Sequence, residues 1–186
     1  MAIVSFFFDK QRDLQNIWKA ANSKSSLADF SRNIKPELLY LAEGRSLEET
    51  GQDIEKFNQK IYENELVREL PDILDKSWAR IEDHFIKRLE RITGKKFGSR
   101  QITGYITTIS KCPYNPRESW FMVSLFNSIP GCMLTTAHEL FHMHMHDYFF
   151  DILKLDIGEE KAHDIKEAVT TSLLNMEFKD LWIVED

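Results

Sequence analysis

The sequence predicts an α+β fold that is mainly helical and carries one small antiparallel sheet. Three observations support this prediction. In the first half of the chain, apolar residues recur at intervals of three and four, which is the spacing of one face of a helix. Residues 102–109 and 120–126 are rich in β-branched and aromatic side chains, as strands are. Residues 131–149 are apolar nearly all round, which indicates a buried helix.

Short helices are expected first in the N-terminal half. Residues 9–22 repeat Leu and Ile at helical spacing, and residues 26–33 are compatible with a second short helix. A third helix is expected over 37–43, because Pro36 suits a helix start and Gly44 a helix end.

Two longer helices should follow. Ser46 and Glu49 have the spacing of a capping box, which predicts a helix that continues to Pro71. The clearest pattern covers residues 74–92, and Gly94 supplies its C-terminal stop. We expect these two helices to pack as an antiparallel hairpin.

The sequence pattern changes from helix-like to strand-like near residues 94–97. The two β-rich runs are joined by a loop that contains prolines and asparagine, and they predict the small sheet. Pro130 and Gly131 then precede the apolar helix, a connecting segment follows, and a last helix is expected over residues 159–177. We therefore divide the chain into a helical region, 1–94, and a second domain, 95–186.

Composition excludes several classes of protein. A hydrophobic content of 42% with 13 Phe and 4 Trp excludes a disordered chain, and a net charge of −6 without a basic run argues against a nucleic-acid surface. Cys112 and Cys132 are too few for a disulfide framework or a cysteine zinc module, and Cys132 should be a buried small residue. No leader or membrane-length apolar segment is evident. We expect a cytoplasmic protein, and its oligomeric state stays open.

The apolar helix contains a His-Glu-x-x-His motif, formed by His138, Glu139 and His142. Residues four apart lie on one face of a helix, so both imidazoles can bind one metal ion, with Glu139 beside it. This is the pattern of a zinc hydrolase. In a buried helix these side chains need partners, which favours a metal site over histidines present by composition alone.

A catalytic zinc site needs three protein ligands and an open position. On the motif helix, His144 points away from the pair, and His146 lies about 12 Å along the axis from His138. The third ligand should therefore come from the last helix. Glu167 is the first candidate, because it stands in mid-helix among small neighbours, and Glu160 is the second.

Two further residues of the last helix are candidate ligands. Glu159 shares with Glu160 a place at the helix start, where acidic residues are expected from the helix dipole alone. His163 lies one turn before Glu167 and so on the same face. His84, alone in the predicted helix over residues 74–92, is expected to be a surface or core histidine rather than a ligand.

The motif followed by a glutamate on a second helix resembles the gluzincin class of zinc metallopeptidases. The run 135–142, with Glu167-Ala168 and Leu173-Leu174, is similar to small bacterial gluzincins that include repressor-cleaving peptidases. The resemblance covers about residues 100–178. It implies a zincin-like catalytic domain with zinc ligands His138, His142 and Glu167. It also implies an edge strand that binds an extended peptide.

Two features depart from this family. The gap between the second histidine and the glutamate, 167 − 142 = 25, is longer than in thermolysin-like enzymes. Thr171 stands where those enzymes carry an aspartate that orients a ligand histidine. Met145 and Tyr148 stand where metzincins carry a glycine and a third histidine, which excludes that class.

The expected function is hydrolysis of peptide bonds in a peptide or protein substrate, with Glu139 as general base. His163 and Tyr148 are candidates for a second group that stabilises the oxyanion. An extended substrate would pair with residues 102–109 or 120–126 as an added strand. The alternative is a non-catalytic module, in which the same ligands hold a structural or regulatory zinc ion and the helical region binds a partner.

Overall fold

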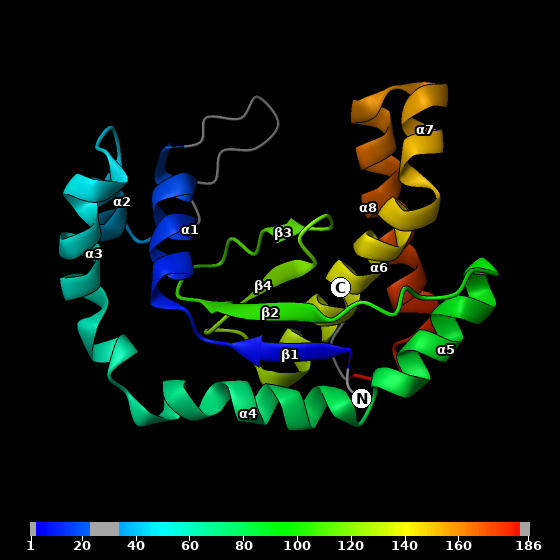
Figure 1. Ribbon diagram of the computed structural model, residues 1–186, viewed down its shortest axis with the longest axis horizontal. Coiled ribbons are helices and arrows are strands. Elements are labelled where there is room, and N and C mark those ends of the chain that lie inside the picture. Colours follow the sequence, from blue (N-terminus) through cyan, green and yellow to red (C-terminus); the bar gives the residue numbers. More distant parts are fainter. Residues whose placement is uncertain (1–2, 23–33, 183–186) are drawn as a thin grey trace.

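The computed structural model describes residues 3–22 and 34–182. They form an α+β fold in which helices surround one four-stranded sheet (Figure 1). Helices α1 to α3 lie at one end of the sheet and α5, α7 and α8 at the other, while α6 starts behind the strands and runs toward α8. In chain order the elements are β1 (Val4–Phe7), α1 (Lys10–Asn22), α2 (Pro36–Ala42), α3 (Leu47–Tyr62), α4 (Glu65–Ala79), α5 (Glu82–Thr93), β2 (Ile102–Thr107), β3 (Tyr114–Asn115), β4 (Trp120–Ser124), α6 (Ile129–Tyr148), α7 (Phe150–Ile157) and α8 (Glu159–Glu177).

The sheet is mixed, with the strand order β1-β2-β4-β3. Strand β2 pairs in parallel with both β1 and β4, and only the short β3 is antiparallel to β4. The prediction of an antiparallel sheet is therefore wrong. Residues 108–119, which connect β2 to β4, return the chain to the end of the sheet where β2 begins, so β4 runs parallel to β2. Within this connection, β3 pairs antiparallel to β4. Neither β2 nor β4 is an outermost strand, so the predicted edge at residues 102–109 or 120–126 is wrong too.

Strand β1 was not predicted, because a run of four residues is too short for an alternating pattern to be recognised. Val4 and Phe6 point into the core, whereas Phe7 is exposed. Phe6 pairs with Gly104 of β2, and a Cβ atom at position 104 would lie 2.6 Å from the Phe6 ring. Glycine is therefore required where this ring crosses the strand.

Several helix predictions are confirmed. Helices α1, α2, α6 and α8 lie where the sequence places them, and the predicted helix over residues 26–33 is outside the described part of the chain. The capping box of α3 is present, since the Ser46 side chain accepts from the Glu49 backbone and the Glu49 side chain accepts from the Ser46 backbone. The segment predicted as a connection after α6 is mostly helix α7.

The two predicted long helices are three helices with different boundaries. Helix α3 ends at Tyr62, because Asn64 caps a new helix by accepting from the Leu66 N–H, and Pro71 lies inside that helix. A second break comes near Arg80. The predicted hairpin is wrong: Figure 1 shows α4 running along the sheet and α3 pointing away from it.

The main core lies between the sheet and helices α4, α5, α6 and α8, and a smaller one joins α1 to α2 and α3. The main core combines residues from both predicted regions, since Val4 and Trp78 pack with Phe121 and Leu140. Cys132 is buried there, as predicted. Within the described residues, no helix is both long enough and apolar enough to cross a membrane.

Candidate metal centre

Helix α6 places the two motif histidines inside the protein. Ser128 caps the helix by accepting from the Gly131 N–H, and Pro130 stands in its first turn, where a missing N–H costs nothing. Apolar residues on all sides bury the helix against the sheet, α4 and α8. One helical turn separates His138 from His142, so their ring centroids lie 4.2 Å apart.

Helix α8 brings Glu167 to the same point. Glu167 Oε2 lies 3.2 Å from His138 Nε2 and 3.2 Å from His142 Nε2. The three possible ligand atoms all lie within 4.8 Å of one another. Ala162, Thr170 and Leu174 form the buried face of α8 and hold this helix close to α6. The structure therefore brings together the three residues that the sequence selected as ligands.

Two buried polar atoms at this point make no hydrogen bond. His142 Nε2 is one of them, because its short separation from Glu167 lacks hydrogen-bond alignment, and Glu139 Oε2 is the other. Buried polar groups are nearly always paired, so an unpaired His142 Nε2 that lies 3.2 Å from Glu167 Oε2 suits an ion. Glu139 Oε2 lies 3.5 Å from the other ring nitrogen, His142 Nδ1. Two imidazoles and one carboxylate are also the donors of many catalytic zinc sites. The residues present therefore fit zinc.

Lys166 is part of this centre and was not predicted. Its side chain is only 1% exposed. The ammonium donates to Glu167 Oε1 at 2.6 Å and to Tyr114 OH at 2.9 Å, and it lies 3.2 Å from His142 Nδ1. A lysine is rarely buried unless it is paired, and these contacts supply its partners. No local sequence signal marks it, because Tyr114 lies about fifty residues earlier.

The surrounding charges stabilise the ionised form of Glu167. Partial burial alone would raise the pKa of this carboxyl group. Contacts with His138, His142 and Lys166 outweigh that effect and hold the pKa well below its usual range. Glu167 is therefore a carboxylate at neutral pH, as a metal ligand must be.

Strand β3 covers the centre through Tyr114. The Tyr114 hydroxyl accepts from Lys166 and lies 3.1 Å from His146 Nε2. Burial, followed by the charges of Glu139 and Glu167, raises the pKa of Tyr114, so the hydroxyl stays protonated. Burial and the nearby Lys166 lower the pKa of His146 to about 4. These two side chains are therefore neutral hydrogen-bonding groups beside the ligands.

The other ligand candidates do not join the described cluster. Glu160 is exposed at the start of α8, and Glu159 pairs with Lys154. His163 packs against the Phe150 ring at a centroid distance of 4.8 Å. His144 faces away from His138 and His142, as predicted, and contacts Thr93 and Phe97 instead.

The two residues predicted to stabilise the oxyanion make contacts away from the metal ligands. The Tyr148 hydroxyl donates to the Lys96 carbonyl at 2.6 Å, and His163 is the ring that packs on Phe150. Tyr114 is the hydroxyl that the structure places beside the ligands. Tyr114 lies in a strand of only two residues, which is too short to show a recognisable sequence pattern. It could therefore not be predicted from the sequence.

Comparison of the chain with protein-family models, with curated proteins and with solved structures gives no match. The functional argument therefore depends on the residues and on their arrangement.

Proposed function

We propose that this chain is a zinc-dependent metallopeptidase with His138, His142 and Glu167 as the metal ligands. One observation carries the proposal: three suitable donor atoms from two helices converge within 4.8 Å of one another. Glu139 follows the first ligand directly and is the candidate general base. A zincin-like catalytic domain and a cytoplasmic location belong to the same proposal.

A zinc ion held by these ligands would supply an activated water and an electrophile for the substrate carbonyl. Glu139 would accept the proton of the attacking water and return it to the leaving amine. Lys166 and Tyr114 would hold the ligands in place, because Lys166 fixes Glu167 Oε1 and leaves Oε2 facing the histidines. Tyr114 is also the candidate donor to an oxyanion, replacing Tyr148 and His163 in that role.

The proposed substrate is an extended peptide or an exposed protein segment. Such a segment can add a strand to the edge of a sheet. Strand β3 is the outermost strand on the side of the metal ligands, and it pairs with β4 through only two residues. We therefore place the substrate along β3, next to Tyr114.

The first test is metal content, because the proposal requires about one zinc ion per chain. Purified wild-type protein should contain it, and His138→Ala with His142→Ala should remove it while circular dichroism still reports a folded chain. Wild-type protein that retains no zinc after incubation with it would overturn the proposal.

The second test uses Glu139→Gln, which changes the base without removing a ligand. This variant should retain zinc and lose cleavage of a mixed peptide library, measured by mass spectrometry with a chelator control. The matched variant is Glu160→Gln, which alters an exposed carboxylate of α8 and should cleave as wild type does. Equal cleavage by the wild type and Glu139→Gln would contradict the proposed role.

A structural or regulatory zinc ion is the second candidate function. The burial of Glu139 favours it, since this residue is only 6% exposed and a base must reach the water that it deprotonates. In this case the wild type would bind zinc and gain stability from it, without cleaving any peptide of the library. The two assays together therefore separate an enzyme from a binding module.

A further inference from the structure

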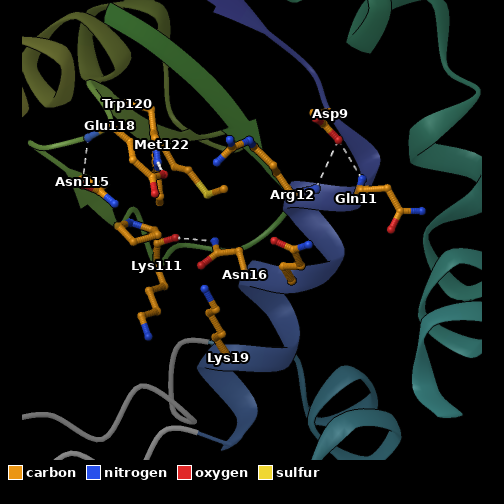
Figure 2. A pocket seen from close by; sticks show the side chains of 12 residues that line it. Asp9, Gln11, Arg12, Asn16, Lys19, Lys111, Asn115, Glu118, Trp120 and Met122 are labelled. Carbon is orange, nitrogen blue, oxygen red and sulfur yellow. Dashed lines mark hydrogen bonds between the residues drawn. The ribbon is translucent and has the colours of Figure 1, made fainter. Parts of the chain in front are cut away.

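A second candidate site lies on the face of the sheet opposite the metal ligands. It is a cavity of about 490 Å³ between α1 and the strands β3 and β4. Figure 2 shows side chains from both walls converging on this space. Along β3 and β4 the side chains alternate, so Tyr114 and Phe121 face the core and Asn115, Trp120 and Met122 face the cavity.

The helical wall of the cavity is a polar stripe. Arg12, Gln15, Asn16 and Lys19 follow one another at intervals of three, one and three along α1, which puts them on one face. This face looks across to the strands, and Asn16 is almost fully buried there. Asn16 donates to Thr107 Oγ1 and to the Lys111 carbonyl, so the floor of the cavity is fixed by hydrogen bonds.

The charged groups of the lining carry a net positive charge. Three cations, Arg12, Lys19 and Lys111, line the cavity with two carboxylates. Both carboxylates accept hydrogen bonds from neutral groups of the chain. Asp9 caps α1 by accepting from the Gln11 and Arg12 backbones, and Glu118 accepts from the Trp120 indole.

Two of the cations, Lys19 and Lys111, lie close enough for their charges to interact. Partial burial lowers the pKa of Lys111, and the charge of Lys19 lowers it further. The Arg12 guanidinium carbon lies 4.3 Å from the Tyr105 ring and 5.2 Å from the Trp120 ring, which fixes its position. An anion entering the cavity would relieve the repulsion between Lys19 and Lys111.

We propose that this cavity binds a small organic phosphate. A phosphate monoester carries nearly two negative charges, whereas a ligand with one carboxylate carries a single charge. The phosphate monoester therefore suits a site with three cations better. The organic part would lie against Trp120, Met122 and Pro113. The volume is within the usual range for small-molecule sites. This proposal does not depend on the metal centre.

Protein-observed NMR of the tryptophan indole N–H groups tests it on the full chain. The ligand probes are a panel of mononucleotides and sugar phosphates, with inorganic phosphate and a nucleoside as references. At least one organic phosphate should bind with a Kd below about 1 mM and shift the Trp120 signal, assigned with Trp120→Phe. The Trp18 indole, which donates to the Arg45 carbonyl, should not move.

Charge reversal distinguishes this cavity from general attraction of anions. Lys19→Glu should weaken binding about tenfold or more, because it removes a charged donor and adds repulsion. Lys60→Glu makes the same change on an exposed position of α3 and should leave the Kd within about twofold. The proposal is overturned if no organic phosphate shifts Trp120, or if the two variants weaken binding equally. Binding of the nucleoside as tight as that of the nucleotide would also overturn it.

Discussion

The ammonium of Lys166 lies 2.6 Å from Glu167 Oε1, whereas Glu167 Oε2 lies 3.2 Å from the Nε2 atom of each of the two histidines. One carboxylate oxygen is thereby held by a buried cation, and the other remains available to a metal ion. The arrangement favours binding through a single oxygen. It also offsets part of the negative charge that Glu139 and Glu167 bring to a buried region.

Removing the third ligand should weaken zinc binding. We expect Glu167→Ala to raise the Kd for zinc by about tenfold or more, since a lost ligand should cost at least as much as a lost hydrogen-bond partner of a ligand. Glu160→Ala should leave the Kd unchanged. Competition with a fluorescent zinc chelator measures both values, and the reverse result would assign the ligand role to Glu160.

Much of this centre could be predicted from the sequence because it depends on local rules. The spacing of His138 and His142 fixes a shared helix face, and the bounds of α8 follow from Gly158 and the helical pattern. The choice of Glu167 over Glu160 followed from its mid-helix position, and the structure places only Glu167 in the cluster.

The partners that come from distant segments could not be predicted. Lys166 looks like an exposed lysine in the sequence, and only packing against β3 shows that its partner is Tyr114. The parallel pairing of β2 with β4 depends on how residues 108–119 cross the sheet, which no periodic pattern encodes. Likewise, Asn64 rather than Pro71 decides where α4 begins, because a side-chain cap outweighs the proline.

The burial of Lys166 should make it important for stability without metal. Lys166→Met keeps the apolar stem but removes a charged donor to Glu167 and Tyr114, so we expect the free energy of unfolding to fall by about 1–3 kcal/mol. Lys161→Met, on an exposed turn of the same helix, should change it by less than about 0.5 kcal/mol. Urea unfolding in the presence of a chelator measures both. Equal effects would show that the buried ammonium contributes no more than a surface lysine.

His146 should make stability depend on pH below neutrality. Its pKa is about 4 in the folded protein, against an ordinary value of 6.5. The unfolded chain therefore binds the proton more readily, so the contribution of His146 to stability is complete above pH 6.5 and is lost as the pH falls toward 4. The slope from this group is at most about 1.4 kcal/mol per pH unit.

The measurement is the free energy of unfolding in urea between pH 7 and pH 5, with a chelator present. His146→Gln should flatten the decline, because glutamine does not titrate. His84→Gln, which alters an exposed histidine on α5, should keep the wild-type slope. If His146→Gln keeps the wild-type slope, other groups cause the loss of stability in acid. His144 is the next group to test, because burial lowers its pKa as well.

The contact between Phe6 and Gly104 predicts opposite effects for two glycine substitutions. A Cβ at position 104 would lie 2.6 Å from the Phe6 ring and 3.1 Å from Phe121, and both rings are fully buried. Gly104→Ala should therefore displace β1 from β2 and lower the free energy of unfolding by about 1–3 kcal/mol. Gly51 lies within α3 with no atom near its Cβ position, so Gly51→Ala should raise stability by about 0.5–1 kcal/mol. Urea unfolding of the two variants gives the comparison, and stabilisation by Gly104→Ala would show that β1 does not pack on β2 as described.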